Sequence, residues 1–210
     1  MKIESCSFDH DSPIPSKYAF CRIDPENHAT FSDNISPELC WSDLPEGTKS
    51  LVLLCVDPDV PTRPDDVNQE GRSVRADLPR TRFVHWVMVD IPPSCTGVGE
   101  GECSSGVIPR GKQDPPGPAG TRQGMQDYTG WFEGDAEMGG KYFGYDGPAP
   151  PWNDEIIHHY HFQIYATNLD RCPVDGDFCG VDVVQAIKDN ILGEAEIVGT
   201  YTLNPKLASD

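Results

Sequence analysis

The stretch that decides the fold is Leu51-Val-Leu-Leu-Cys-Val-Asp-Pro-Asp-Val-Pro61. It opens with an unbroken apolar run, which is typical of a strand buried on both faces. Asp57 and Pro58 end the run, and the two prolines stiffen the turn because each fixes φ and removes a backbone donor. We therefore expect a central strand that places Asp57 at one end of a sheet.

A second apolar run, Phe83-Val-His-Trp-Val-Met-Val89, ends at Ile91-Pro-Pro93. Both faces of this run are apolar as well, so it predicts a second central strand covered on two sides. If the two strands pair antiparallel, the end of the first meets the start of the second. Asp57 and His85 would then converge at the same end of the sheet.

Three further segments extend the predicted sheet. Tyr160–Ala166 alternates in polarity and predicts a third strand. Val181–Leu192 carries apolar residues at helical spacing before Gly193, which predicts a helix. Ala195–Leu203 alternates again and predicts a closing strand. Strands with one late helix favour a mainly β fold, with an antiparallel or mixed sheet of Greek-key type, over a βαβ fold.

Polar or conformationally rigid residues from several segments are expected at the end of the sheet where Asp57 and His85 converge. In the third strand, His158 and Tyr160 share the more apolar face and should point inward, while His159 and His161 should face solvent. Gly147-Pro-Ala-Pro-Pro151 has few free donors and stiff dihedrals, so it can line a pocket without filling it. Each feature alone fits an ordinary core residue or turn, but together they favour a binding pocket.

Length and composition favour a single domain over residues 1–210. The 20 glycines and 20 prolines predict many turns, and residues 94–141 read as a long glycine-rich loop or insertion. The N-terminus has no apolar signal-peptide core and no run is long enough to span a membrane, which predicts a cytoplasmic protein. The eight cysteines include no Cys-x-x-Cys pair, so we expect reduced thiols, with Cys95–Cys103 and Cys172–Cys179 as the candidate bridges.

The formal net charge of −18 repels nucleic acid and anionic membrane surfaces, so neither is an expected partner. We also expect no cofactor and no bound metal, because Asp57 and Asp59 lie in a proline-flanked turn that does not direct both carboxylates at one ion.

The motifs described above resemble the phosphatidylethanolamine-binding protein (PEBP) family, also called the Raf kinase inhibitor proteins, and its bacterial branch most of all. The matching segments are Asp57-Pro-Asp-Val-Pro61, Val84-His-Trp86, Gly147-Pro-Ala-Pro-Pro151 and His158-His-Tyr160. Shorter matches are Asn34-Ile-Ser-Pro37, Leu44-Pro-Glu-Gly47 and Val198-Gly-Thr-Tyr201. The resemblance implies two antiparallel sheets with a few short flanking helices, and a pocket for phosphate-like anions.

Carried over residue by residue, the resemblance implies a ligand-binding set of Asp57, Asp59, His85, Gly147, Ala149, Pro150, Pro151, His158 and Tyr160. Ala149 stands where animal members often have glycine, which narrows the expected pocket. No counterpart of the C-terminal helix of animal members follows Leu203, so kinase inhibition is not carried over. The resemblance also implies a homodimer, and with the tight turn it makes Val60–Pro61 a candidate cis peptide bond.

The leading hypothesis is a non-enzymatic binding or regulatory protein for a phosphate, a phosphomonoester or a phospholipid headgroup. The alternatives are a metal-assisted hydrolase that uses Asp57, Asp59, His85 and His158, and a protein-docking inhibitor of a kinase or protease. Charging of His85 or His158 near their ordinary pKa, together with the ligand's own proton, predicts tighter anion binding at acid pH.

Overall fold

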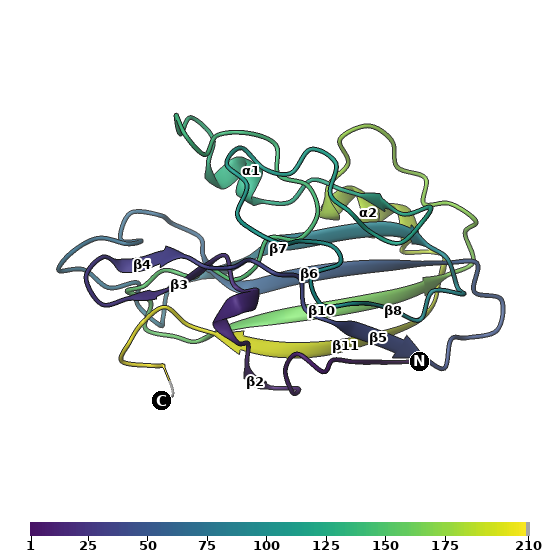
Figure 1. Ribbon diagram of the computed structural model, residues 1–210, viewed down its shortest axis with the longest axis horizontal. Coiled ribbons are helices and arrows are strands. Elements are labelled where there is room, and N and C mark those ends of the chain that lie inside the picture. Colours follow the sequence, from purple (N-terminus) through teal and green to yellow (C-terminus); the bar gives the residue numbers. More distant parts are fainter. Residues whose placement is uncertain (209–210) are drawn as a thin grey trace.

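The computed structural model describes residues 1–208. A six-stranded sheet forms its centre (Figure 1). Across the sheet the strands are β2 (Ser12–Pro13), β11 (Ile191–Tyr201), β10 (His158–Thr167), β6 (Ser50–Pro61), β7 (Arg80–Ile91) and β9 (Arg122–Gln123). Neighbouring strands are antiparallel, except that β2 runs parallel to β11.

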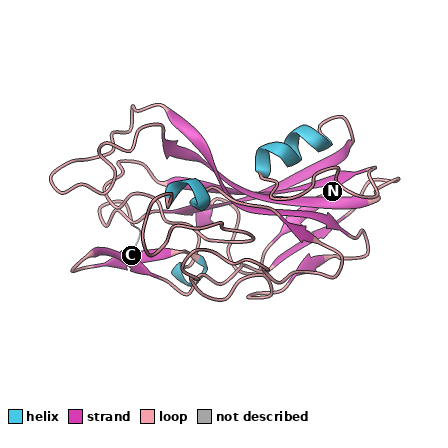
Figure 2. Ribbon diagram, turned by 90° about the horizontal axis from the view of Figure 1, so that it is seen from above, coloured by secondary structure: helices cyan, strands magenta, loops and turns pink. Residues whose placement is uncertain are grey.

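The two faces of the central sheet bury two separate cores. One face packs against a second sheet of β1 (Lys2–Glu4), β5 (Leu39–Ser42) and β8 (Gly97–Val98). The other face is covered by α2 (Gly180–Ile187), which lies above the long strands in Figure 2. Because side chains alternate along a strand, Leu53 enters the first core and Leu54 the second.

The remaining elements gather at the end of the sheet where the apolar part of β6 stops (Figure 1). They are the 3₁₀ helix η1 (Ser16–Tyr18), the hairpin of β3 (Cys21–Asp24) and β4 (His28–Phe31), and the short helix α1 (Tyr128–Trp131). None of these elements is a strand of the central sheet. Together they surround the ends of its strands.

The predicted central strands are confirmed. Residues 51–56 lie in β6 and 83–89 lie in β7, and the two pair antiparallel with Asp57 opposite Phe83. Residues 160–166 lie in β10, whose inward side chains are buried. The predicted fold class of antiparallel sheets with few helices is also confirmed, and the β3–β4 hairpin adds a small third sheet.

The predicted helix over Val181–Leu192 is too long. The helix ends at Ile187, and Ile191 begins the last strand opposite Thr167. Sheet pairing satisfies the backbone groups of this segment, so the apolar spacing of Ile191 reflects the strand and not a helical face. The buried helical positions are Gly180, Val183 and Ile187, at spacings of three and four residues on one face.

Three further points concern the other predictions. The Val60–Pro61 bond is trans, so the proposed cis bond is wrong. All eight cysteines are free thiols. In the part of the chain that the structure describes, no helix is both long enough and apolar enough to cross a membrane.

Candidate functional site

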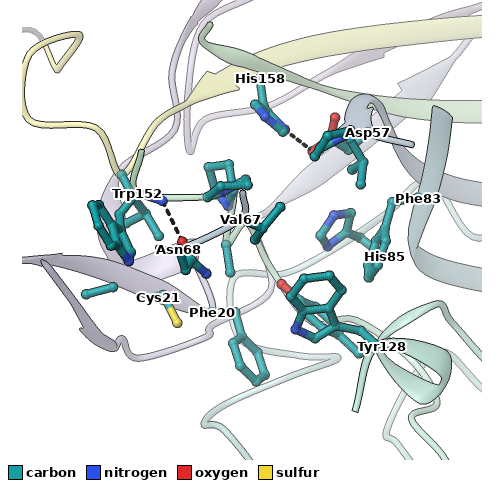
Figure 3. Close-up of a pocket in the computed structure, with 18 of the residues that line it drawn as sticks. Phe20, Cys21, Asp57, Val67, Asn68, Phe83, His85, Tyr128, Trp152 and His158 are labelled. Atoms are coloured by element: carbon teal, nitrogen blue, oxygen red, sulfur yellow. Dashed lines mark hydrogen bonds and ion pairs between the residues drawn. The ribbon is translucent and has the colours of Figure 1, made fainter. Parts of the chain in front are cut away.

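A pocket of about 380 Å³ opens at the end of the central sheet (Figure 3). Its floor consists of Asp57 from β6, His85 from β7, and His158 and Tyr160 from β10. Because β6 lies between β7 and β10, the antiparallel register brings these four side chains to one place. All four residues are almost completely buried.

His158 is held between two carboxylates. Its Nδ1 donates to Asp57 Oδ2 at 2.7 Å and its Nε2 donates to Asp154 Oδ2 at 3.1 Å. Burial opposes the imidazolium charge, but the hydrogen bonds and charges of Asp154 and Asp57 outweigh it and raise the pKa of His158 to about 9. Arg80 in turn donates to both oxygens of Asp154, at 2.6 and 3.1 Å. The four groups therefore form a chain of three ion-pair contacts, Arg80–Asp154, Asp154–His158 and His158–Asp57.

His85 has the opposite protonation behaviour. Burial lowers the pKa of His85 to about 4, against the smaller raising effect of Asp57. Its Nδ1 lies 3.0 Å from the backbone oxygen of Asp146, so in the neutral ring this nitrogen donates to the carbonyl. That hydrogen bond fixes the tautomer and leaves Nε2 as an acceptor at the pocket.

The hydroxyl of Tyr160 is a free donor at the floor. It is buried and has no hydrogen-bond partner within residues 1–208. Burial, the charge of Asp57 and the proximity of its carboxylate raise the pKa of Tyr160 well above its ordinary value, so the hydroxyl keeps its proton. The contact with Asp57 does not have the geometry of a hydrogen bond, so the hydroxyl is still available as a donor. A buried hydroxyl without a partner is unfavourable by about 1–3 kcal/mol, which a ligand oxygen would recover.

The walls of the pocket are apolar and largely aromatic. They come from Phe20 and the β3–β4 hairpin, from the loop at 62–79, from β7, from α1 and from the proline-rich segment 147–151. In Figure 3, Asp57 and His158 lie above the pocket, Phe20 and Tyr128 below it, and Trp152 and Asn68 to its left. The aromatic residues of the walls are Phe20, Phe31, Phe83, Tyr128, Trp131, Phe132 and Trp152.

Asn153 anchors the loop at 62–79 against the pocket. Its Nδ2 donates to the backbone oxygens of Asp66, Gln69 and Arg72 at 2.8, 3.3 and 3.1 Å. Its Oδ1 accepts a hydrogen bond from the backbone N–H of Asn68 at 3.0 Å. One buried amide therefore joins four positions of this loop, and Pro64, Val67 and Asn68 of the loop form one wall of the pocket.

Asp146 lies behind His85 and is the centre of a buried polar network. Its Oδ1 accepts hydrogen bonds from Lys112 Nζ at 2.5 Å and Asn34 Nδ2 at 2.6 Å, and its Oδ2 accepts one from Gln126 Nε2 at 2.7 Å. Burial raises the pKa of Asp146, and the nearby charge of Lys112 opposes that rise. The network fixes the backbone that holds the His85 ring.

Seven of the nine residues implied as ligand-binding line the pocket, and these are Asp57, His85, Ala149, Pro150, Pro151, His158 and Tyr160. Asp59 and Gly147 do not. Asp59 Oδ2 lies 2.8 Å from His159 Nδ1 and accepts the backbone N–H of His159 at 2.9 Å. Gly147 lies behind the wall, where a Cβ would be 2.0 Å from the Tyr18 carbonyl oxygen, so glycine is required for this close approach.

The four residues of the hydrolase alternative are therefore not gathered around one point. Asp59 is turned away from the pocket, and both ring nitrogens of His158 are hydrogen-bonded to carboxylates. Within residues 1–208, no group of three or more His, Cys, Asp or Glu side chains is arranged to hold a metal ion.

Sequence reasoning missed the second carboxylate on His158, the network around Asp146 and the aromatic wall. Two features of the sequence could have indicated the second carboxylate and the aromatic wall. Asp154 lies four residues before His158. Tyr128-Thr-Gly-Trp-Phe132 concentrates aromatic residues in an otherwise glycine-rich stretch. No signal pointed to Lys112.

Known proteins resemble this chain along almost its whole length. The family model described as phosphatidylethanolamine-binding protein matches residues 4–202. A UPF0098 protein of Methanothermobacter thermautotrophicus is 30% identical over 203 residues, which cover 96% of this chain and 98% of that protein. The UPF0098 protein YbcL of Escherichia coli is 31% identical over 81% of this chain and 73% of its own length.

Two crystal structures share the fold. That of E. coli YbcL, described as a member of the mammalian PEBP family, matches with a TM-score of 0.69 at 26% identity, over 96% of this chain and 97% of that one. That of the PEBP homolog CT736 from Chlamydia trachomatis matches with a TM-score of 0.63 at 25% identity, over 95% of both chains. With its strands, its pocket motifs and its relatives in agreement, this chain belongs to the phosphatidylethanolamine-binding protein family.

Proposed function

We propose that this chain is a non-enzymatic binding protein whose pocket takes a small phosphate-like anion, as a phosphomonoester or a phospholipid headgroup. The observation that carries the proposal is the buried, unpartnered hydroxyl of Tyr160 at the pocket floor. A hydroxyl that keeps its proton donates well to an anionic oxygen. The carboxylate of Asp57 beside it is paired with the charged ring of His158, so it repels an anion less than an isolated carboxylate would.

The floor favours an anion that still carries one proton. His85 Nε2 and Asp57 are both acceptors, while Tyr160 is the donor. The P–O–H group of a monoanionic phosphomonoester can donate to one of the acceptors, while another of its oxygens accepts from Tyr160. A dianion would leave both acceptors facing its lone pairs.

A cytoplasmic location is part of the proposal. Its support is that all eight cysteines are free thiols, which is the usual state in a reducing compartment.

Affinity for a phosphomonoester is expected to be higher at pH 5.5 than at pH 8. His158, with a pKa of about 9, and His85, with a pKa of about 4, keep their charge states between these values. Of the two causes that the sequence suggested, histidine titration therefore drops out, and the ligand's second ionisation near pH 6 alone sets the dependence. With that pKa, about three quarters of the ligand is monoanion at pH 5.5 and about 1% at pH 8, so the affinity ratio is at most roughly 75.

Calorimetric titration with O-phosphoethanolamine at both pH values measures this ratio. A methylphosphonate monoester, which stays an anion without a P–O–H group throughout this range, is the control for pH effects on the protein, and its weaker binding should be the same at both. Tighter phosphomonoester binding at pH 8 would contradict the proposed protonation state.

Replacing Tyr160 with phenylalanine is expected to weaken binding of O-phosphoethanolamine by ten- to hundredfold, since a hydrogen bond to a charged group contributes about 1.5–3 kcal/mol. The free energy of unfolding should stay the same or rise by about 1 kcal/mol, because the substitution removes a buried hydroxyl that has no partner. Calorimetry and chemical denaturation measure the two effects.

Tyr142→Phe is the matched control, because its buried hydroxyl donates to the Met138 carbonyl at 2.7 Å outside the pocket. It should lose about 1 kcal/mol of stability and keep the wild-type affinity. If Tyr160→Phe also loses stability but binds normally, the Tyr160 hydroxyl serves the fold and the proposed function loses its support.

A further inference from the structure

The pocket contains an aromatic wall that a phosphate anion does not need. The rings of Phe20 and Tyr128 stack with centroids 4.7 Å apart and planes 22° apart, and those of Tyr128 and Phe132 stack at 5.6 Å and 16°. Phe83 meets Tyr128 edge to face, at 5.1 Å and 74°. These are favourable ring geometries, so the wall is a packed and ordered surface.

Two more rings continue this wall to the pocket mouth and remain open to solvent. Phe31 of β4 is 52% exposed and Trp131 of α1 is 47% exposed, and both line the pocket. Single exposed apolar side chains are ordinary on protein surfaces. Here, however, the exposed rings adjoin a buried aromatic wall in one cavity, and an apolar surface of this kind marks a contact site for a ligand.

The wall is held in place before any ligand binds. The hydroxyl of Tyr128 donates to the Gly147 carbonyl at 3.0 Å, and its backbone N–H donates to Gln126 Oε1 at 2.8 Å. Gln126 also belongs to the network around Asp146. The rings therefore keep a fixed orientation relative to the polar floor, which favours a rigid ligand group over a flexible one.

We propose that the organic group of the ligand is aromatic, so that the pocket takes an aryl phosphate with its phosphate on the floor and its ring against the wall. This inference rests on the proposed function of phosphate binding. A pocket of about 380 Å³ lies at the small end of the range for small-molecule sites, about 300–1,000 Å³, which suits a phosphate with one compact ring system. The inference also gives residues 94–141 a role, since α1 supplies Tyr128 and Trp131 to this wall.

Calorimetric titration at pH 5.5 with inorganic phosphate, phenyl phosphate and hexyl phosphate tests the inference. Phenyl phosphate should bind at least tenfold more tightly than inorganic phosphate, because its ring leaves water. It should bind about fivefold more tightly than hexyl phosphate, which has as many carbons but gains no ring–ring contact and loses rotational freedom.

Each other result overturns the inference in a different way. Equal or tighter binding of hexyl phosphate would mean that the wall takes an aliphatic chain, as in a lipid. Equal binding of phenyl phosphate and inorganic phosphate would mean that the organic group does not touch the wall. Failure of all three ligands to bind would remove the proposed function itself, and the inference with it.

The variant Trp131→Ala tests whether the phenyl ring of the ligand lies against the aromatic wall. The variant should lower the ratio of phenyl phosphate to inorganic phosphate affinity about fivefold, since it removes one ring face. Ile108→Ala is the matched control, because Ile108 is also an exposed apolar residue of the 94–141 segment and does not line the pocket. An unchanged ratio in Trp131→Ala, or an equal change in both variants, would contradict the placement of the ring.

Discussion

Replacing Lys112 with methionine is expected to lower the free energy of unfolding by about 3–5 kcal/mol. The Lys112 and Asp146 side chains are 9% and 1% exposed, and Nζ lies 2.5 Å from Asp146 Oδ1. Without the ammonium group, Asp146 is a buried carboxylate with amide donors but no opposite charge. Burial already raises the pKa of Asp146, so it should take up a proton more readily in the variant, and the loss of stability should shrink at acid pH.

Lys141→Met is the matched control. Lys141 also forms a 2.5 Å ion pair, with Asp177, but the two side chains are 58% and 50% exposed. Solvent screens that pair, so its loss should change stability by less than about 1 kcal/mol. Urea denaturation followed by circular dichroism measures both variants.

The double variant Lys112→Met with Asp146→Asn tests the cause of the effect. It removes both charges, so it should recover part of the stability that the single lysine variant loses. A double variant that is as unstable as the single one, or a single variant that loses less than about 1 kcal/mol, would show that charge burial is not what makes Lys112 important.

The sequence predicted the floor of the site because regular strands carry it. Asp57, His85 and Tyr160 lie in or beside apolar runs, and antiparallel pairing of such runs leaves few ways to arrange their ends. Asp59 shows the limit of this reasoning. In a regular strand it would share a face with Asp57, but the β6–β7 register shifts between Asp57 and Val60, and the backbone N–H of Asp59 donates to Asp57 Oδ1 at 2.8 Å. The predicted turn is therefore an irregularity within β6, which continues to Pro61, and this irregularity directs Asp59 to the outside.

The wall and the buried network could not be predicted in the same way. Lys112 and Asp146 are 34 residues apart, and the segment between them has no periodicity that would indicate a contact. The two pocket histidines also look alike in the sequence. Their pKa values diverge because His158 contacts two carboxylates while His85 is buried against a carbonyl, and only tertiary contacts create that difference.

The stability of the protein is expected to be greatest near pH 6.5. Between about pH 4 and 6.5, an unfolded chain binds a proton at His85 that the folded protein excludes, so stability rises with pH. Between about pH 6.5 and 9, the folded protein keeps a proton on His158 that the unfolded chain has released, so stability falls with pH. A shift of about 2.5 units corresponds to a change on the order of 3 kcal/mol for each histidine.

Other groups act at the acid end, so the contribution of each histidine must be isolated. The pKa of Asp146 is raised in the folded protein. Stability therefore falls as the pH rises above the ordinary pKa of an aspartate, which opposes the effect of His85. The lowered pKa of Asp154 acts below about pH 4, outside this range. Denaturation of wild type and His85→Gln between pH 4 and 9 therefore gives the His85 contribution as a difference between two curves.

His85→Gln should reduce the increase in stability between pH 4 and 6.5. It should not change the decrease in stability above pH 6.5. His158→Asn should do the reverse. Because that variant removes the cation beside Asp57 and leaves Asp154 with Arg80 alone, a magnetic resonance titration of the wild-type His158 ring provides the independent measurement. His10→Asn is the control for removal of a histidine outside the site, since His10 is exposed and does not line the pocket. A wild-type curve that rises steadily from pH 6.5 to 9, or a His158 ring that titrates near pH 6.5, would refute the doubly paired imidazolium at the floor of the pocket.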